Sequence, residues 1–304
     1  MSNVSKQLHH DCGFHQGCAA VEWIIETRAR DLGGFQVRRC LPNRRRRMIG
    51  PWIFFDHMGP AHFPAGQGID VRPHPHIGIA TVTYLLEGEM LHRDSLGSEQ
   101  AIRPGDLNLM VCGSGIVHSE RQREAIKSQP QTLHGLQLWL ALPADQEEID
   151  PAFYHYPQAD IPATTVNEVP LRVMMGSAYG LNSPVRTFAD TLYVEASLKA
   201  GQTLELPYAP ERGLYVAAGA ISMGDTTVQE HALAVLAPAD GVVIKATRDA
   251  RIALIGGAPL GERFIEWNFV SSRAERIEQA KRDWVAGRFA DVPGDDQEFI
   301  PLPE

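Results

Sequence analysis

The sequence predicts an all-β protein with two barrels in tandem and one short helix near its C-terminal end. Short apolar runs, broken by Gly, Pro and Asp, recur at intervals of about 8 to 12 residues, which is typical of β-sandwiches and barrels. The strand and turn rhythm of the first half returns from residue 171 onwards. Helical spacing of apolar residues is nearly absent until residues 273–287. A chain of 304 residues is long enough for two domains with cores of their own.

Residues 1–22 form an N-terminal extension that we expect to lie outside both barrels. The extension is polar where a secretion signal would need an apolar stretch. Its His and Cys side chains could in principle bind zinc, but their spacing matches none of the usual zinc motifs. A terminal tail with incidental ligands is therefore the expected interpretation. The side chains concerned are His9, His10, Cys12, His15 and Cys18.

Charge and cysteine content narrow the class of protein. The chain has 28 Lys and Arg residues against 37 Asp and Glu residues, and its formal charge of -9 disfavours direct binding of nucleic acid or anionic membranes. The basic run Arg44–Arg47 is an exception that we expect to be a solvated edge. Apolar stretches fall far short of the ~20 residues that span a bilayer. The four cysteines show no CxxC spacing, so we expect a cytoplasmic protein without disulfide bonds.

Two pairs of alternate residues predict a metal site. His74 and His76 lead into a run rich in Ile, Val and Thr, and His118 and Glu120 follow the turn Gly113–Gly115. Side chains two positions apart in a strand project from one face, about 6.6 Å apart at Cα, so each pair can reach one ion. Three imidazoles and a carboxylate suit iron, nickel, cobalt, copper, manganese or zinc. Such a set leaves positions free on an octahedral ion, which favours chemistry over structural bracing.

These residues also have an ordinary structural interpretation. A single histidine is more often a core residue with hydrogen-bonded ring nitrogens than a metal ligand. The presence of two paired motifs on strands favours metal binding here. Cys112 is expected to be a small buried apolar side chain. Asp56 and His57 could accept a hydrogen bond from the second ring nitrogen of a metal-binding histidine, although a core or turn role is favoured. Nearby aromatic residues could line a pocket, but plain core is favoured for them: Trp52, Phe54, Phe55 and Phe63.

The second half of the chain is expected to be a metal-free copy of the first. Five prolines between residues 143 and 170 predict a linker, placed at 146–170, because proline is excluded from central strands. Pro210–Gly213 stands where a histidine pair would be needed, and His231 is the single histidine of the second barrel. This barrel therefore cannot assemble the same ligand set, and we expect it to pack against the first and shield the site.

A helix is predicted to close the chain. Ile277, Ala280 and Trp284 fall at helical spacing after residue 273. Ser272 and Glu275 stand three residues apart at the start of this pattern, which predicts a capping box.

The segments HPHIG and GSGIVHSE resemble the metal-binding segments of the pirin family in the cupin superfamily. The resemblance extends from about residue 23 to 290, and it includes stretches at 25–60, 134–143 and 261–289. It implies two cupin barrels, each a jelly roll or double-stranded β-helix: a metal-binding cupin at 23–145 and a degenerate cupin with the closing helix at 171–304. It also implies the ligand set His74, His76, His118 and Glu120. Ala80 stands where most cupins carry their glutamate, so Glu120 takes that place.

Two functions are compatible with this resemblance. Bacterial relatives of the family are described as quercetin 2,3-dioxygenases, which open a flavonol ring and release carbon monoxide. This implies an Fe(II) or similar ion, dioxygen, an aromatic substrate, and Glu120 as ligand and general base. The alternative is a non-enzymatic regulator in which the metal shapes a surface for a partner protein. Two fused cupins can cover each other's faces, so we expect a monomer.

Overall fold

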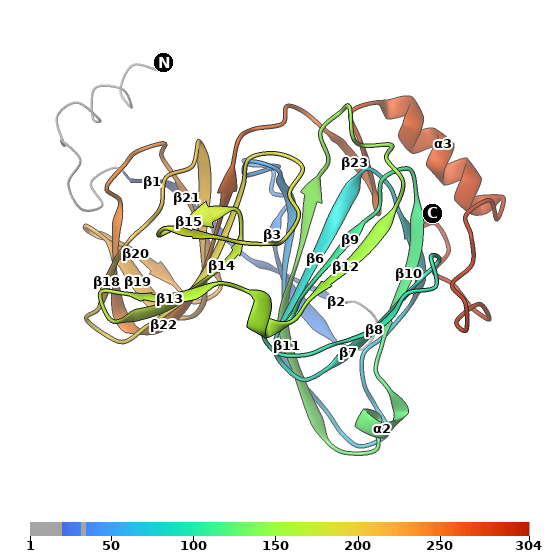
Figure 1. Cartoon of the computed structure of the whole chain (residues 1–304), viewed down its shortest axis with the longest axis horizontal. Helices are drawn as coiled ribbons and strands as arrows, with labels where there is room; N and C mark the ends of the chain where they lie inside the picture. Colours follow the sequence, from blue (N-terminus) through green and yellow to red (C-terminus); the bar gives the residue numbers. More distant parts are fainter. Residues whose placement is uncertain (1–19, 32–34, 304) are drawn as a thin grey trace. The chain divides into compact units, whose positions relative to one another are not determined.

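The computed structural model describes residues 20–31 and 35–303, and these residues form two compact units built almost entirely of strands (Figure 1). Among these residues, we call 29–31, 35–39, 53–158 and 260–303 the N-terminal unit, and 20–28, 40–52 and 159–259 the C-terminal unit. Both are cupin-type domains, as predicted. Within the described ranges, no helix is both long and apolar enough to cross a membrane.

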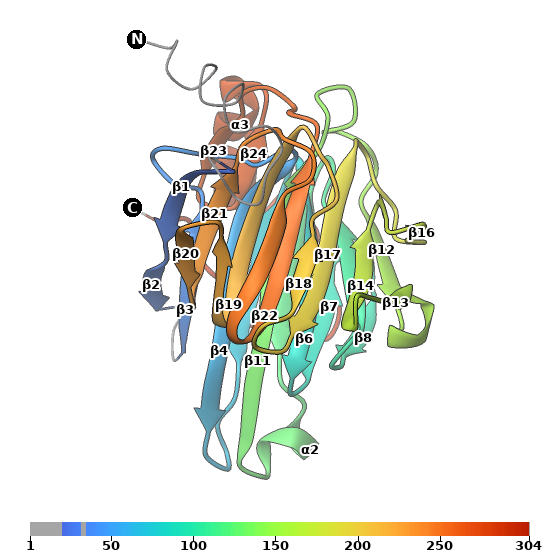
Figure 2. The same ribbon diagram turned by 90° about the vertical axis from the view of Figure 1, so that its left-hand side faces the viewer.

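The C-terminal unit is built on one large antiparallel sheet, whose strands β19, β22 and β17 run side by side (Figure 2). Seven strands form the path β1-β21-β19-β22-β17-β14-β13, while β18 pairs with β22 and β20 with β19. The strands are β1 (Val21–Glu26), β13 (Ala163–Val166), β14 (Val169–Met175), β17 (Thr191–Leu198), β18 (Thr203–Glu205), β19 (Glu211–Met223), β20 (Thr226–Gln229), β21 (Ala232–Leu236) and β22 (Val243–Gly257). A small ribbon joins β15 (Ser177–Ala178) to β16 (Leu181–Asn182).

The interior of the C-terminal unit is filled with aliphatic side chains. Val173, Val194, Leu214 and Leu254 are all 1% exposed or less and belong to one continuous apolar cluster. His231 lies in the turn before β21, with a φ of +67°. The buried side chains of this cluster carry no nitrogen or oxygen atom that could bind a metal ion.

Each unit combines separate stretches of the chain, unlike the two continuous domains expected from the sequence. Strand β1 pairs with β21 and so belongs to the C-terminal unit, although the chain around residue 25 was expected in the first barrel. The closing helix was expected in the second barrel, yet residues 260–304 belong to the N-terminal unit. The unit to which a segment belongs depends on which distant strands it pairs with, and this pairing cannot be inferred from the order of residues alone.

The segment 146–170, expected to be a linker, carries strands at the edges of two sheets. Strand β12 (Ala152–Tyr156) pairs with β9 (Leu107–Val111), and β13 (Ala163–Val166) pairs with β14. Pro151, Pro157 and Pro162 flank these strands and do not interrupt them. Proline is excluded from the middle of a sheet but is tolerated at strand ends and on edge strands, so a proline-rich segment can still extend both sheets.

The N-terminal unit consists of two sheets that face each other. The larger has the order β12-β9-β6-β11-β4-β3-β2, and the smaller has the order β5-β10-β7-β8. Side chains meet across the gap: His76 lies against Trp139, Glu120 against Gln137, and His92 against Phe153. The strands are β2 (Arg28–Asp31), β3 (Gln36–Leu41), β4 (Trp52–Phe63), β5 (Asp70–His76), β6 (Ile79–Glu87), β7 (Met90–Asp94), β8 (Glu99–Ile102), β9 (Leu107–Val111), β10 (Ile116–Arg121), β11 (Gln131–Ala141) and β12.

Strand β6 shows how the sequence builds this unit. Its residues IATVTYLLE are mostly β-branched or aromatic, which suits a buried pleated surface. The strand ends at Gly88, whose φ of +87° permits the tight turn into β7. A Cβ atom at this position would lie 2.3 Å from the carbonyl oxygen of Thr132, so the backbone approach also requires glycine.

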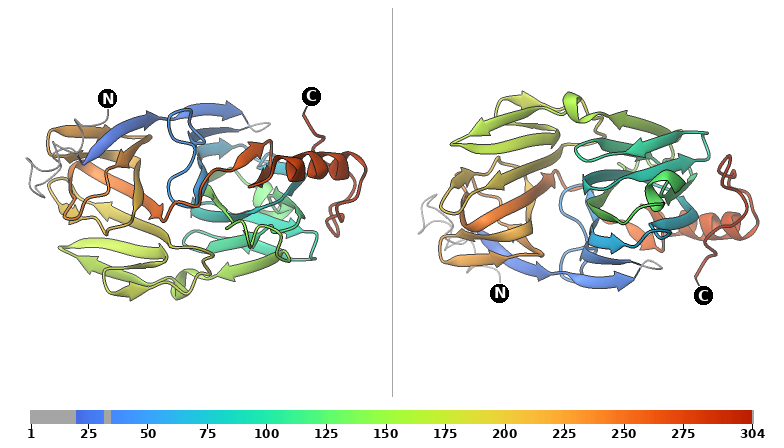
Figure 3. Two further views of the ribbon diagram at one scale, coloured as in Figure 1. Left: turned by 90° about the horizontal axis from the view of Figure 1, so that it is seen from above. Right: turned by 90° about the horizontal axis from the view of Figure 1, so that it is seen from below.

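Short elements complete the N-terminal unit, with helix α3 and the segment after it at one end (Figure 3). Ile277 and Ala280 of the helix pack on Ile77 and Phe269. The elements are α2 (Glu124–Lys127), β23 (Phe264–Glu266), β24 (Phe269–Ser271) and α3 (Ala274–Val285). In a 3-10 turn, η1 (Gln158–Asp160), the chain passes from residues of the N-terminal unit to residues of the C-terminal unit.

The predicted capping box at the start of α3 is wrong. The residue before the helix is Arg273, and no side chain there caps a backbone N–H. Ser272 instead donates its backbone N–H and its hydroxyl to Glu147, at 2.8 and 2.9 Å. Glu147 also accepts a hydrogen bond from the Ser271 hydroxyl at 2.9 Å. A buried carboxylate from a distant loop thus holds the two residues before Arg273, and a sequence motif cannot reveal it.

We expect Glu147→Ala to lower the free energy of unfolding by about 3 kcal/mol, because the donors of Ser271 and Ser272 would lose their buried acceptor. Glu275→Ala removes an exposed helix carboxylate and should cost less than about 0.5 kcal/mol. Urea denaturation of both variants measures the difference. A larger loss for Glu275→Ala would restore the capping box.

Candidate metal centre

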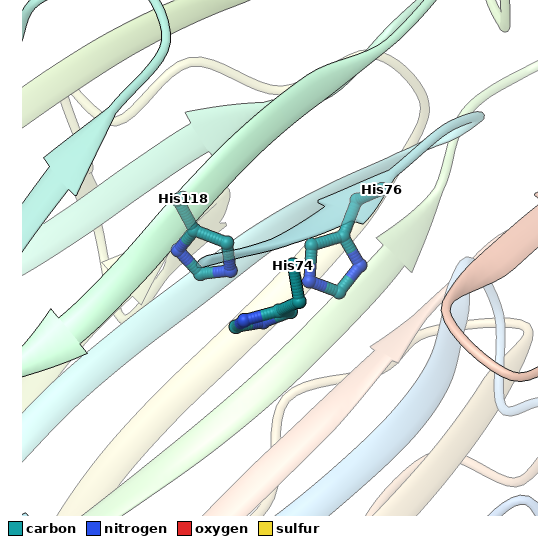
Figure 4. Close-up of side chains that lie close together, drawn as sticks. All are labelled: His74, His76 and His118. Carbon is teal, nitrogen blue, oxygen red and sulfur yellow. The ribbon is translucent and has the colours of Figure 1, made fainter. Parts of the chain in front are cut away.

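Three histidines from two neighbouring strands face one another inside the N-terminal unit (Figure 4). In the antiparallel ladder of β5 and β10, His118 stands opposite His74, and Ile116 stands opposite His76. One nitrogen of each imidazole lies within 4.8 Å of the corresponding atom of the others. All three side chains are buried. The predicted alternation therefore brings the three imidazoles together, and they can hold one metal ion.

Backbone carbonyls orient two of these imidazoles. Nδ1 of His74 lies 2.8 Å from the carbonyl oxygen of Arg72, and Nδ1 of His76 lies 3.2 Å from that of Asn268. A carbonyl only accepts hydrogen bonds, so Nδ1 of each ring must carry the proton. The Nε2 lone pair of each ring is then free to bind a cation.

His118 provides the test of whether the site fits a metal. Both of its ring nitrogens are buried and have no hydrogen-bond partner. Burying a polar atom without a partner costs free energy, so such an atom in a folded core indicates a missing ligand. A cation held by His74, His76 and His118 would satisfy one of these nitrogens, and the residues present therefore fit a metal ion.

Burial also sets the protonation of the three histidines. It lowers the pKa of His74 to about 4 and the pKa of His76 and His118 well below the usual value, because the charged ring would lose its hydration. Neighbouring imidazoles lower the pKa of His76 and His118 further. All three are therefore neutral at pH 7, which is the form that binds a metal.

Glu120 lies on the same strand face, two residues after His118. The ladder between β5 and β10 has a bulge between these residues, and Glu120 stands opposite His92 on the other neighbouring strand, β7. Its Oε1 accepts a hydrogen bond from Nε2 of Gln137 at 2.6 Å. Burial raises the pKa of Glu120 to about 7, although this hydrogen bond opposes the shift. The compact ligand group consists of the three imidazoles, so Glu120 as a fourth ligand remains a prediction.

The structure adds His92 and Asp94 to the site, which the sequence analysis missed. In the ladder, His92 stands opposite Glu120, and Asp94 stands opposite His118. Nε2 of His92 lies 3.0 Å from Oδ2 of Asp94, whose Oδ1 accepts the backbone N–H of Leu96 and Ser98. The pair is a third alternate-residue motif, His-x-Asp in the strand MLHRD. The rule used for the other two pairs would have found it.

Aromatic rings flank the histidines. The Trp139 ring meets His76 edge-on at a centroid distance of 4.9 Å, and Phe54 stacks on Trp139 at 3.9 Å. On the other side, Phe153 stacks on His92 at 4.3 Å, and His92 lies 5.3 Å from His118. Trp139 and Phe153 were not among the aromatic residues considered from sequence, which all lie between residues 52 and 63, before the first histidine pair.

The other aromatic and polar candidates have structural roles. Trp52 belongs to the C-terminal unit, where its Nε1 donates to the carbonyl oxygens of Leu192 and Gly256, and Phe63 packs in an apolar cluster of the N-terminal unit. Asp56 forms a two-pronged ion pair with Arg39, and Nε2 of His57 lies 2.6 Å from that of His134. Phe55 is fully buried. The carbonyls of Arg72 and Asn268 orient the ligands instead.

The remaining sequence features lie apart from the site. Cys112 is a buried free thiol whose pKa is raised well above the usual value by burial, so the expected interpretation as a small core residue holds. Within the basic run, Arg44, Arg45 and Arg47 are exposed, and Arg46 pairs with Glu211 at 2.5 Å. The histidines and cysteines of the N-terminal extension lie outside the described residues.

Replacing one histidine of the cluster should remove the metal. We expect His76→Ala to lose bound metal, since two imidazoles remain and a cavity opens beside Trp139. His62→Ala removes an exposed imidazole on strand β4 and should retain the wild-type content. Elemental analysis of both purified variants provides the comparison. Stoichiometric metal in His76→Ala would exclude this residue as a ligand.

The metal-free protein should lose stability in acid. The folded-state pKa of His74, about 4, lies below its unfolded value of 6.5, so the unfolded chain takes up the proton first as the pH falls. The contribution is complete above pH 6.5 and is lost towards pH 4, by about 3 kcal/mol for this residue. His74→Gln, which cannot titrate, should show a smaller loss in denaturation curves recorded from pH 7 to pH 4. Equal losses would contradict this assignment.

Comparison with known proteins places the chain in a family. The Pirin family model matches residues 34–140, and the model of the Pirin C-terminal cupin domain matches residues 193–290. A pirin-like protein of Caulobacter vibrioides is 47% identical over 288 residues, which cover 93% of this chain and 100% of that protein. Human pirin is 32% identical, with coverage of 83% and 87%. A crystal structure of quercetin 2,3-dioxygenase from Acinetobacter baumannii is 34% identical, covers 93% of this chain and 95% of that one, and has a TM-score of 0.86. The chain therefore belongs to the pirin family.

Proposed function

We propose that this protein is a metal-dependent dioxygenase that cleaves flavonols, of the quercetin 2,3-dioxygenase type. The observation that carries the proposal is the group of three buried, neutral imidazoles with the carboxyl group of Glu120 on the same strand face. The similarity to the Acinetobacter baumannii quercetin 2,3-dioxygenase supports the choice of reaction.

The proposed ligands are His74, His76, His118 and Glu120, and the proposed metal is Fe(II), with nickel, manganese, cobalt, copper and zinc as alternatives. When bound, such an ion supplies free positions for substrate oxygen atoms and a route for electrons towards dioxygen. The role of the histidines is to hold these positions open. Hydrogen bonds to Arg72 and Asn268 fix the rings of His74 and His76, so their Nε2 atoms are presented without rearrangement.

Glu120 is proposed as the general base. A carboxyl group with a pKa of about 7 is partly ionised at neutral pH and can accept the proton of a flavonol hydroxyl group. Gln137 holds Oε1 in a hydrogen bond, which leaves Oε2 as the atom available for the proton. Loss of the hydroxyl proton makes the flavonol ring electron-rich, and this is the condition for its reaction with dioxygen.

The aromatic side chains at the site suit a flat, aromatic substrate. Trp139 and Phe153 come from β11 and β12, and each contacts one of the histidines. Phe54 covers one face of Trp139 and His92 covers one face of Phe153, so a substrate ring would stack on the opposite face of either ring. In the proposed reaction, both atoms of dioxygen enter the ring-opened ester and one ring carbon leaves as carbon monoxide. The substrate itself supplies the electrons, so no separate reductant is needed.

Replacing the proposed base should slow the reaction without emptying the site. Glu120→Gln keeps the shape and can still accept a hydrogen bond from Gln137, but it cannot take a proton. We expect kcat for quercetin to fall by about 10²- to 10⁴-fold. The rate of oxygen consumption by metal-reconstituted protein measures this change. Glu99→Gln removes an exposed carboxylate from the same sheet and should leave kcat unchanged.

Two results would contradict the proposal. Unchanged turnover in Glu120→Gln would exclude this carboxyl group as the base. Wild-type protein with full metal content that consumes no oxygen with a panel of flavonols would argue against a dioxygenase and for a non-enzymatic regulator.

A further inference from the structure

The outer face of the strands that carry the histidines is covered by the end of the chain. His118 and Glu120 point into the unit, and the alternation of strand β10 therefore turns Val117, Ser119 and Arg121 to the opposite face. Residues 288–303, which we call the C-terminal segment, follow helix α3 and run beside β10 (Figure 1). The backbone N–H of Ile300 donates to the carbonyl oxygen of Pro73, the residue before His74, at 2.8 Å.

Arg121, the residue after Glu120, is the main contact between strand β10 and this segment. Its Nε donates to Oδ2 of Asp295 at 2.6 Å, and its Nη2 donates to Oδ1 at 2.8 Å. The same guanidinium also contacts Asp70 on strand β5 and Glu298 of the segment. The side chains of Arg121 and Asp295 are 17% and 10% exposed, so water screens this pair only weakly. The guanidinium thus ties both ligand-bearing strands to the C-terminal segment.

The contact of Arg121 with Asp70 and Asp295 lies next to a register shift in the ladder of β5 and β10. Strands β5 and β10 shift register between His118 and Glu120, so backbone hydrogen bonds alone do not fix Glu120 relative to His74. Beyond the shift, Glu120 stands opposite Val71, and Arg121 stands opposite Asp70. The side-chain contacts of Arg121 therefore hold the strands together where the backbone pairing is irregular.

The C-terminal segment is itself anchored by aromatic packing. Nε1 of Trp284 donates to the carbonyl oxygen of Ile300 at 3.1 Å, and its ring meets Phe299 edge-on at 5.5 Å. Phe289 lies so close to Gly115, just before strand β10, that a Cβ atom there would be 2.9 Å from its ring. A cavity of about 100 Å³ remains between the segment and the outer face at Pro73 and Val117, so the contact depends on its ionic pairs as well as on packing.

We propose that the C-terminal segment is a clamp that sets the geometry of the metal centre from the outer face, with Asp295 and Arg121 as its positioning residues. The inference rests on the metal site proposed above. Neither residue contacts the ion in this arrangement: both act through the backbone of β10, which carries His118 and Glu120. The clamp fixes the separation of β5 and β10 and hence the distance between their imidazoles.

Cobalt(II) binding tests the clamp, because its affinity and visible absorption spectrum both report ligand geometry independently of turnover. Asp295→Asn keeps the size of the side chain and removes its charge. We expect the Kd for cobalt(II), measured by competition with a chelator, to rise by about 10- to 100-fold, with an altered absorption spectrum. Asp295→Glu should restore the spectrum in part. Asp249→Asn removes an exposed carboxylate of the C-terminal unit, which pairs with Lys199, and should leave both measurements unchanged.

A second variant keeps the test decisive if Asp295→Asn does not fold. Arg121→Lys retains the positive charge but loses the two-pronged contact with Asp295, and it should show the same direction of change. Wild-type affinity and an unchanged spectrum in a folded variant would overturn the clamp while leaving the metal site intact. Wild-type protein that binds no cobalt(II) would overturn the metal site, and the clamp with it.

Discussion

The metal centre depends on one constraint: two strands must keep their polar residues in register on a buried face. Strands β5 and β10 place His74, His76 and His118 inside the N-terminal unit, where burial keeps the rings neutral and leaves both nitrogens of His118 without a partner. This arrangement costs free energy in the metal-free chain and is offset when a cation is bound. The rest of the unit supports it, through carbonyl groups behind the rings and aromatic side chains around them.

The polar face is wider than a three-histidine site requires. Asp94, which accepts hydrogen bonds from two backbone amides, holds His92 beside Glu120, and Gln137 reaches Glu120 from the opposite sheet. Buried polar groups of this kind are retained where they are mutually satisfied or where a ligand completes them. The C-terminal unit shows the contrast, since the interior of its sheet is aliphatic and carries no comparable cluster among the residues described. The N-terminal unit therefore has a buried polar cluster that fits a metal ion, whereas the cluster described in the C-terminal unit is apolar.

Contacts on the outer face of β5 and β10 affect the spacing of the two strands that carry the histidines. Arg121 links β5 and β10 to Asp295 at the point where their backbone pairing shifts register. A site whose ligands come from two strands is sensitive to the spacing of those strands, so an ion pair on the far face can influence it without touching the metal. The closing helix belongs to the N-terminal unit for a related reason: Ile277 and Ala280 pack on Ile77, the residue after His76.

The sequence predicted the strand class and the meeting of the three imidazoles, because side-chain alternation in a strand depends only on local backbone geometry. The two-cupin architecture was implied by the resemblance to the pirin family. The sequence also led to the prediction that the second barrel cannot repeat the ligand set, because His231 is its single histidine. The tertiary structure decided what local rules cannot: that β1 pairs with β21, that Ser272 binds Glu147 and forms no capping box, and that Gln137 and Phe153 meet the site while Asp295 pairs with Arg121 on the outer face. These contacts join residues far apart in the chain, and only the pairing and packing of whole sheets brings them together.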